Sequence, residues 1–206
     1  MYKKYDTALV NDAMEQKGTM DVGIKPVSPG MEIIGKAYTV DCYPGSIITC
    51  HKALLEVPKD SVLVINGRDN SNGALWGGLM TNQAIKKGIK GVVVDGAVRD
   101  VAYIKNTGFP VFSRYITPSV GSNRKVGSTG NDIVCGGVTV KTGDLIIGDD
   151  DGVVVVPQNR IKEILSKAEE ISLREKELSK KIEAGLLLAD EIGMTPIIDK
   201  AKESEN

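Results

Sequence analysis

The sequence is poor in the residues that most often carry nucleophilic or metal-centred chemistry. Among 206 residues there are three cysteines and one histidine, His51. Cys42, Cys50 and Cys135 are odd in number and have no C-x-x-C spacing, so neither a disulfide framework nor a structural zinc site is encoded. A Ser-His-Asp triad would need His51 as its base, and no G-x-S-x-G motif accompanies it. We interpret His51 as a histidine on a helix face near the core.

Excess charge and long apolar runs are also missing. Lys and Arg number 26 against 27 Asp and Glu, so neither nucleic acid nor an anionic membrane is expected as a partner. No stretch approaches the ~20 apolar residues of a membrane-spanning helix, and residues 1–6 contain no apolar signal segment. With reduced cysteines, this composition predicts a cytoplasmic protein. The absence of G-x-G-x-x-G and P-loop motifs disfavours nucleotide binding by those devices.

Strand and helix patterns alternate through the first half of the chain. Strands are expected at 32–42, 61–66, 91–95 and 110–113, and helices at 6–17, 46–56, 77–87 and 99–106. After Thr117 the character changes, because glycine, serine and asparagine crowd the next residues. Short antiparallel strands then follow at 133–140, 145–148 and 153–156, with a hairpin turn at 149–152. These patterns predict an α/β protein with a mixed, layered sheet.

The chain from Pro157 onward is strongly helical. Its apolar positions recur three and four apart, with Glu175 as the polar exception, at Ile161, Ile164, Ala168, Ile171, Glu175, Leu178, Ile182 and Gly185. A helix of about 27 residues would extend ~40 Å, too long to lie wholly on so small a core. We therefore expect one domain over 1–157 and a helical extension over 158–206 that packs against another subunit. Residues after Thr195 are interpreted as a solvated tail.

A glycine-rich helix start is the first candidate for chemistry. Its residues are Gly77, Gly78, Leu79 and Met80. Glycine allows close backbone approach, and the first amides of a helix have no intrahelical acceptor, so such a start can bind a carboxylate. A tight strand-to-helix connection is the commoner explanation of this pattern taken alone.

An Arg-Asp pair, Arg99-Asp100, is the second candidate. It follows the next buried strand, at the sheet edge where open α/β folds bind ligands. Arginine can stabilise a developing oxyanion, and aspartate can hold Mg²⁺. The alternative is a helix cap and a surface ion pair. A similar pair, Arg68-Asp69, ranks lower because a polar loop at 70–73 follows it. Neighbouring parallel strands would bring Arg99-Asp100 beside the glycine-rich start, where a small carboxylate could bind next to a divalent metal.

These motifs together resemble a known family. Gly78, twenty intervening residues and Arg99-Asp100 are similar to the signature of the RraA-like family, which contains the 4-hydroxy-4-methyl-2-oxoglutarate aldolases and the regulators of ribonuclease E activity. Further similarity lies in 91–100, 135–138 and 143–157. The resemblance covers about residues 5 to 190, and several motifs in the right order make it far more specific than any one of them.

The resemblance implies a β-β-α layered sandwich of the swivelling-domain type, assembled as homotrimers or homohexamers with the active site near a subunit interface. It implies a lyase: a class II, metal-dependent aldolase that cleaves 4-hydroxy-2-oxo acids to pyruvate and a second keto acid. Oxaloacetate decarboxylation would proceed through the same enolate. The alternative is a non-catalytic regulator that binds an RNase E-type ribonuclease. Some relatives are named methyltransferases, but this sequence contains no glycine-rich cofactor signature that would indicate such an activity.

Roles follow from the resemblance residue by residue. The amides of Gly77 to Met80 would bind the substrate carboxylate, Arg99 would contact the keto or enolate oxygen, and Asp100 would hold the metal, Mg²⁺ before Mn²⁺ or Co²⁺.

One position departs from the family pattern. Many family aldolases carry an acid three residues after the aspartate, and Tyr103 stands there. Glu175 or Glu177 of a neighbouring subunit could compensate, although Glu175 also fits a polar residue that sets helix register.

Overall fold

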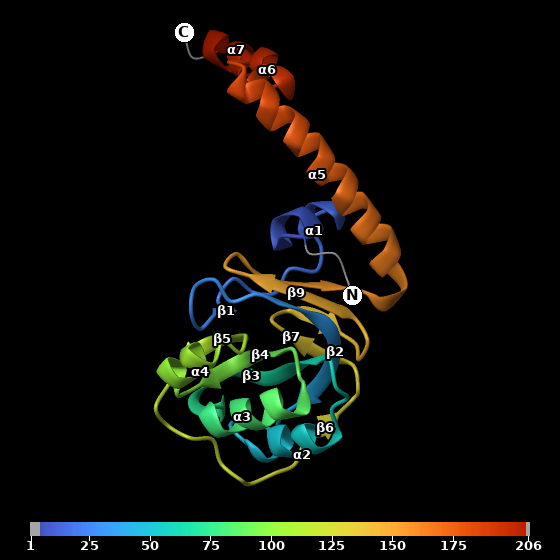
Figure 1. Ribbon diagram of the computed structural model, residues 1–206. Helices are drawn as coiled ribbons and strands as arrows, with labels where there is room; N and C mark the ends of the chain where they lie inside the picture. Colours follow the sequence, from blue (N-terminus) through green and yellow to red (C-terminus); the bar gives the residue numbers. More distant parts are fainter. Residues whose placement is uncertain (1–4, 205–206) are drawn as a thin grey trace.

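The alternating elements of the first half build one mixed sheet with three helices on one face (Figure 1). The computed structural model describes residues 5–204. The helices are α1 (Thr7–Ala13), α2 (Ile48–Glu56), α3 (Gly78–Lys87), α4 (Val101–Thr107), α5 (Ile161–Glu183), α6 (Leu188–Glu191) and α7 (Thr195–Ser204), with a 3-10 turn η1 at Gln158–Arg160. The strands are β1 (Lys25–Pro26), β2 (Ile33–Asp41), β3 (Ser61–Trp76), β4 (Gly91–Val98), β5 (Val111–Ile116), β6 (Ser128–Thr129), β7 (Ile133–Cys135), β8 (Val138–Val140), β9 (Leu145–Asp149) and β10 (Gly152–Val156).

The strand order of the main sheet is β1-β5-β4-β3-β2-β9-β10. Its centre, β5 to β2, is parallel, whereas β9 and β10 run antiparallel and β1 is antiparallel to β5. The two edges approach each other, because Lys25 Nζ beside β1 donates 2.7 Å to the Asp151 carbonyl at the turn before β10. The sheet is therefore curled nearly into a barrel. This mixed, layered α/β architecture is the one predicted.

Two apolar cores hold the layers together. The larger lies between the sheet and helices α2, α3 and α4, and every residue of β4 is buried, as expected for a parallel strand covered on both faces. The smaller joins α1, β9, β10 and the start of α5. Asp149 also fixes α1 to the sheet, since its carboxylate accepts the Thr7 backbone N–H at 2.8 Å and the Thr7 hydroxyl at 2.7 Å.

Two strand predictions are corrected. The polar loop expected at 70–73 is part of β3, which continues past Asn66 with register shifts against β4. Arg68 and Asp69 both have positive φ, 57° and 55°, and this bulge lets the strand resume pairing. The single strand expected at 133–140 is instead the β7–β8 hairpin, because Gly136 and Gly137 turn the chain with φ of 57° and 77°.

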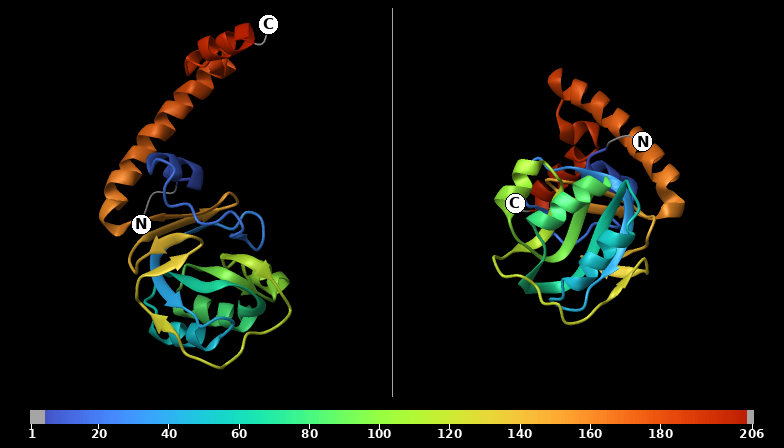
Figure 2. Two further views of the ribbon diagram at one scale, coloured as in Figure 1. Left: turned by 180° about the vertical axis from the view of Figure 1, so that it is seen from behind. Right: turned by 60° about the horizontal axis from the view of Figure 1, so that its bottom comes forward.

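The C-terminal helices differ in part from the prediction. The first turns of α5 bury Ile161, Ile164 and Ala168 within the smaller core, which also contains α1, and the helix then leaves the domain (Figures 1 and 2). The helix has 23 residues, fewer than expected. The residues after Thr195 are exposed up to residue 202, as predicted for a solvated tail, but they form the helix α7; residues 205–206 lie outside the described part. Within residues 5–204 no helix is long and apolar enough to cross a membrane.

Candidate functional site

The two candidate motifs meet where β3 and β4 end. The backbone N–H of Arg99 donates to the carbonyl of Trp76 at 3.0 Å, which aligns the two strand ends. One step further, the backbone N–H of Gly78 donates to Oδ2 of Asp100 at 2.9 Å. The glycine-rich start of α3 and the Arg99-Asp100 pair therefore share one small volume, as neighbouring parallel strands predict.

Buried hydrogen bonds anchor the start of α3. The indole Nε1 of Trp76 donates to the Thr81 hydroxyl at 2.9 Å, and that hydroxyl donates to the Gly77 carbonyl at 3.0 Å. Trp76 and Thr81 are fully buried. Because these side chains satisfy each other away from water, they hold the Gly77–Gly78 backbone in one position.

Both glycines are needed for space. Gly77 has extended backbone, with φ of −165°, so its conformation suits any residue. A Cβ on Gly77 would lie 2.8 Å from Oδ2 of Asp100, and one on Gly78 would lie 2.9 Å from the Tyr103 ring. The glycines therefore let the helix start approach the side chains of α4 closely.

Asp100 adopts a conformation that few residues accept. Its φ and ψ are 60° and 35°, the left-handed region, which aspartate and asparagine tolerate better than most residues. Oδ2 accepts the Gly78 amide and lies 3.6 Å from Nε of Arg99, while Oδ1 has no hydrogen-bond partner among the described residues. Asp100 therefore presents a free carboxylate oxygen beside a guanidinium.

The amides of Leu79 and Met80 remain available to a ligand. They belong to the first turn of α3, whose intrahelical hydrogen bonding begins when the Thr81 N–H reaches the Gly77 carbonyl at 3.0 Å. The Gly78 amide, also a candidate, already binds Asp100. The positive end of the helix dipole lies at the same place. A carboxylate would thus find two backbone donors and Arg99 together.

A pocket of about 250 Å³ opens at this junction. Its lining comprises Ile47, His51, Trp76, Gly77, Gly78, Leu79, Met80, Arg99, Asp100, Val120, Gly121 and Asn123. The volume equals roughly eight water molecules at ~30 Å³ each, which suits a small acid.

His51 is placed differently from the prediction. It is exposed on α2 and lines the pocket instead of lying near the core. Asn123 reaches the same pocket from the loop between β5 and β6. Sequence reasoning missed both, because nothing in the sequence shows that α2 and this loop meet the ends of β3 and β4.

A shallower hollow of about 530 Å³ adjoins the pocket. Leu79 on its rim is 84% exposed, which is unusual for a leucine beside a binding site. Tyr103, which stands where many family aldolases have an acid, donates its hydroxyl to Oδ1 of Asn82 at 2.8 Å. Tyr103 thus serves as part of an apolar wall and supplies no carboxylate.

The donor set fits a cation that keeps most of its water. No group of three His, Cys, Asp or Glu side chains that could hold a metal exists within residues 5–204. Among residues 5–204, Asp100 is the one acid that lines the pocket, and its Oδ1 has no hydrogen-bond partner. Mg²⁺ is commonly held by one or two carboxylates together with waters and substrate oxygens, whereas structural zinc needs four protein ligands.

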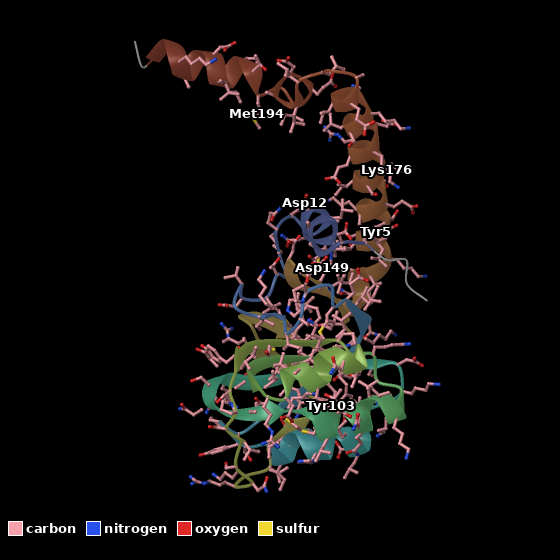
Figure 3. The ribbon with its side chains drawn as sticks, turned by 60° about the vertical axis from the view of Figure 1, so that its left-hand side comes forward. Tyr5, Asp12, Tyr103, Asp149, Lys176 and Met194 are labelled. Carbon is pink, nitrogen blue, oxygen red and sulfur yellow. The ribbon has the colours of Figure 1, made fainter. Side chains whose placement is uncertain are left out.

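Glu175 and Glu177 do not approach the pocket of their own subunit. Both lie on the projecting part of α5, and Figure 3 shows the intervening Lys176 far from Tyr103 of the site. A contribution from a neighbouring subunit stays a prediction. The alternative pair is engaged elsewhere, because Arg68 binds Asp41 at 2.9 Å and Asp69 accepts the Tyr115 hydroxyl at 2.6 Å.

A second charged cluster surrounds Arg114 outside the pocket. Its guanidinium binds Asp95 at 2.6 Å and Asp21 at 2.7 Å. Although burial opposes it, the hydrogen bond from Arg114 to Asp95 raises the pKa of Arg114. The Gly23 backbone N–H and Arg114 hold the pKa of Asp21 below its usual value. These charges are satisfied internally, so the cluster is structural.

Comparison with known proteins matches the same region of the chain. The RraA-like family, described as Aldolase/RraA, matches residues 7–155. A protein of Halalkalibacterium halodurans, provisionally named a 4-hydroxy-4-methyl-2-oxoglutarate aldolase, is 34% identical over 81% of this chain and 80% of its own length. Protein DlpA of Legionella pneumophila is 37% identical over 89% of this chain, which spans only 31% of that protein.

The fold is shared with solved structures. RraAS2 of Streptomyces coelicolor, described as an unusual member of the RNase ES inhibitor RraA protein family, superposes with a TM-score of 0.79 and 25% identity. The match covers 86% of this chain and 93% of that structure.

Proposed function

The chain belongs to the RraA-like family, and from that premise we propose that it is a class II pyruvate aldolase. Its substrates would be 4-hydroxy-2-oxo acids of the 4-hydroxy-4-methyl-2-oxoglutarate type, cleaved to pyruvate and a second keto acid. Oxaloacetate would lose carbon dioxide at the same site. The observation that carries the proposal is the free Oδ1 of Asp100 beside Arg99 and two unused helix amides.

The pyruvyl carboxylate would bind the amides of Leu79 and Met80 at the start of α3. Backbone donors at a helix N-terminus hold such an anion without a counter-charge from a flexible side chain. Trp76 and Thr81 fix this turn, so the donors are in place before substrate arrives.

The 2-oxo oxygen would lie beside Arg99. Cleavage of the C3–C4 bond leaves negative charge on this oxygen as the pyruvate enolate forms, and a guanidinium stabilises that charge more than it stabilises the neutral ketone. A divalent cation bound by Asp100 would supply Lewis-acid stabilisation at the same oxygen.

The proton of the C4 hydroxyl must leave during cleavage. A water in the pocket close to Arg99 is proposed as its acceptor. Decarboxylation of oxaloacetate needs no such acceptor, since it releases carbon dioxide and leaves the same enolate. A variant that lost only the acceptor would therefore retain decarboxylation.

A homo-oligomer, trimer or hexamer, is proposed as the working state. The hollow beside the pocket exposes Leu79 and Tyr103, and the far helices α6 and α7 expose several apolar side chains, including Leu187 and Ile197. A neighbouring subunit would cover such surfaces. The reduced, buried cysteines fit the cytoplasmic location proposed for this assembly.

The test is pyruvate release from 4-hydroxy-4-methyl-2-oxoglutarate and from oxaloacetate. It compares the wild type with Asp100→Ala, each with Mg²⁺ and with a chelator. Metal-dependent release that the substitution abolishes is expected. Absence of turnover across Mg²⁺, Mn²⁺ and Co²⁺ would reject the enzyme for these substrates and favour the alternative, a regulator that binds a ribonuclease.

A further inference from the structure

We propose that His51, with Asn123, binds the second carboxylate of a dicarboxylic 2-oxo acid and so sets a preference for dicarboxylic over monocarboxylic substrates. The inference deepens the proposed function and rests on it. Neither residue belongs to the RraA-like signature motifs, and both were found from their place in the pocket.

His51 and Asn123 form a second polar set within the pocket. The first set, made of the Leu79 and Met80 amides with Arg99 and Asp100, comes from the ends of β3 and β4. The second comes from α2 and from the loop after β5. Apolar side chains make up the rest of the lining, as in sites where a few polar groups fix the orientation of a small ligand.

Neither polar side chain of the second set is used by the protein itself. Among residues 5–204 the His51 ring and the Asn123 carboxamide have no hydrogen-bond partner, although the His51 backbone N–H binds the Ile47 carbonyl at 3.3 Å. Most side chains around this site are engaged, as Tyr103 and Thr81 are. Donors left free in a pocket are available to a ligand.

The position of His51 is held by hydrogen bonds between α2 and α3. Nζ of Lys87, on α3, donates to the carbonyls of Leu54 and Leu55 at 2.6 and 2.9 Å, and this ties the end of α2 to the helix whose start binds the first carboxylate. The spacing between His51 and that start is therefore fixed.

The loop that carries Asn123 is fixed on both sides. Before it, the Ser122 N–H donates to the Gly45 carbonyl at 2.7 Å, and after it, the Ser46 hydroxyl donates to the Lys125 carbonyl at 2.8 Å. The Asn123 carboxamide is thus presented by a pre-formed backbone, which lowers the entropy lost on binding.

Charge favours a second anion. Arg99 and Asp100 offset each other, so a divalent cation together with one substrate carboxylate leaves the pocket with net positive charge. A monocarboxylic acid leaves this charge unbalanced, whereas the distal carboxylate of 2-oxoglutarate balances it.

The experiment measures binding and turnover in His51→Leu and His51→Gln. Calorimetry with saturating Mg²⁺ compares pyruvate, with one carboxylate, and 2-oxoglutarate, with two; oxaloacetate turnover is assayed alongside. Leu55→Gln is the matched control, because Leu55 is 77% exposed on the same helix and lines no part of the pocket. Thermal unfolding of each variant verifies the fold.

His51→Leu is expected to weaken 2-oxoglutarate at least about tenfold, the usual scale for a charged hydrogen bond, and to leave pyruvate unchanged. His51→Gln keeps an N–H donor and should lose less. Equal weakening of both acids, or of neither, would overturn the inference, as would a wild type that binds no acid. Selective weakening without oxaloacetate turnover would keep the inference and reject the proposed enzyme.

Discussion

The backbone N–H of Gly78 donates a 2.9 Å hydrogen bond to Oδ2 of Asp100, which joins the first residue of α3 to the residue that precedes α4. The bond engages one oxygen of the carboxylate and leaves the other, Oδ1, without a hydrogen-bond partner among residues 5–204. A backbone donor cannot rotate away as a side chain can. The free oxygen is therefore positioned by the fold before any ligand binds.

Asp100→Asn separates the catalytic role of the carboxylate charge from the contribution of this side chain to stability. Asparagine accepts the left-handed conformation and can still accept the Gly78 N–H, so the free energy of unfolding should change by less than about 0.5 kcal/mol. Turnover should fall about 10²- to 10³-fold, because the negative charge is lost. Urea unfolding measures the change in stability, and pyruvate release measures the change in turnover. Asp100→Ala, which loses the hydrogen bond as well, should be less stable by about 1–2 kcal/mol.

Gly77→Ala should damage the site more than the fold. The new Cβ would lie 2.8 Å from Oδ2 of Asp100, so the carboxylate must move. Turnover should fall about 10²-fold, because displacements near 1 Å are costly in catalysis. Gly96→Ala is the matched control, since a Cβ there meets its nearest neighbours at 3.4–3.5 Å. Full activity in Gly77→Ala would mean that the approach of α3 to Asp100 is not needed.

Arg114→Leu should destabilise the protein by about 3–5 kcal/mol. Its guanidinium pairs with Asp95, whose side chain is only 10% exposed, and removal leaves that carboxylate buried without a counter-charge, although its Oδ2 still accepts the Gly136 N–H at 2.7 Å. Arg68→Leu, which breaks an exposed pair with Asp41, should cost about 1 kcal/mol or less. Urea unfolding measures the loss of stability in each variant. Comparable losses in the two variants would show that burial of the ion pair does not determine how much stability its removal costs.

Acid should remove the contribution of the Asp21 carboxylate to the free energy of unfolding. The pKa of this carboxyl is lowered in the folded state, so its ionisation stabilises the fold above the unfolded pKa of about 3.9, and the effect is lost as the pH falls through the lower folded pKa. The difference in unfolding free energy between the wild type and Asp21→Asn should therefore shrink below about pH 4. A difference that grows on acidification would contradict the assignment.

The cysteines should be unreactive in the folded protein. All three are buried; the hydrogen bond between the Cys42 and Cys50 thiols and burial raise the pKa of Cys50, and burial raises that of Cys135. Thiols with raised pKa values contain little thiolate, the reactive form, at neutral pH. A thiol-specific colorimetric reagent should label none of them without denaturant and all of them in urea. Labelling of the native protein on the reagent's free-thiol timescale would indicate local opening.

The far helices should control assembly. Leu187→Glu combined with Ile197→Glu places charges at positions that are 68% and 64% exposed, so each subunit should keep its fold. If these residues contact a neighbour, sedimentation should show a smaller species. Lys17→Glu, at a side chain after α1 that is 75% exposed, is the control for an equal change of charge. An unchanged assembly would remove α6 and α7 from the interface.

Local sequence pattern predicts the parallel centre of the sheet well. Strands such as 91–95 carry consecutive apolar residues, Val92 to Val94, because helices or strands cover both faces, and their helices end at glycines such as Gly88. The extension of β3 past Asn66 could not be predicted in this way. Its polar residues resemble a loop, and only pairing with β4 through a bulge keeps them extended.

Some residues of the candidate site can likewise be predicted from local sequence pattern, and others cannot. Gly77, Gly78, Arg99 and Asp100 lie next to strand ends, so topology alone predicts that they meet. His51 reaches the pocket through the packing of α2 against α3, which leaves no local signal in the sequence.

The left-handed backbone at position 100 also limits how this site can change over time. Glycine and asparagine are the residues that replace aspartate there with least strain, and each is one base substitution away from an aspartate codon. Either exchange would remove the carboxylate proposed to hold the cation and leave the folded surface intact. Descent with such a change offers a short route from a catalyst to a protein that serves only as a binding partner.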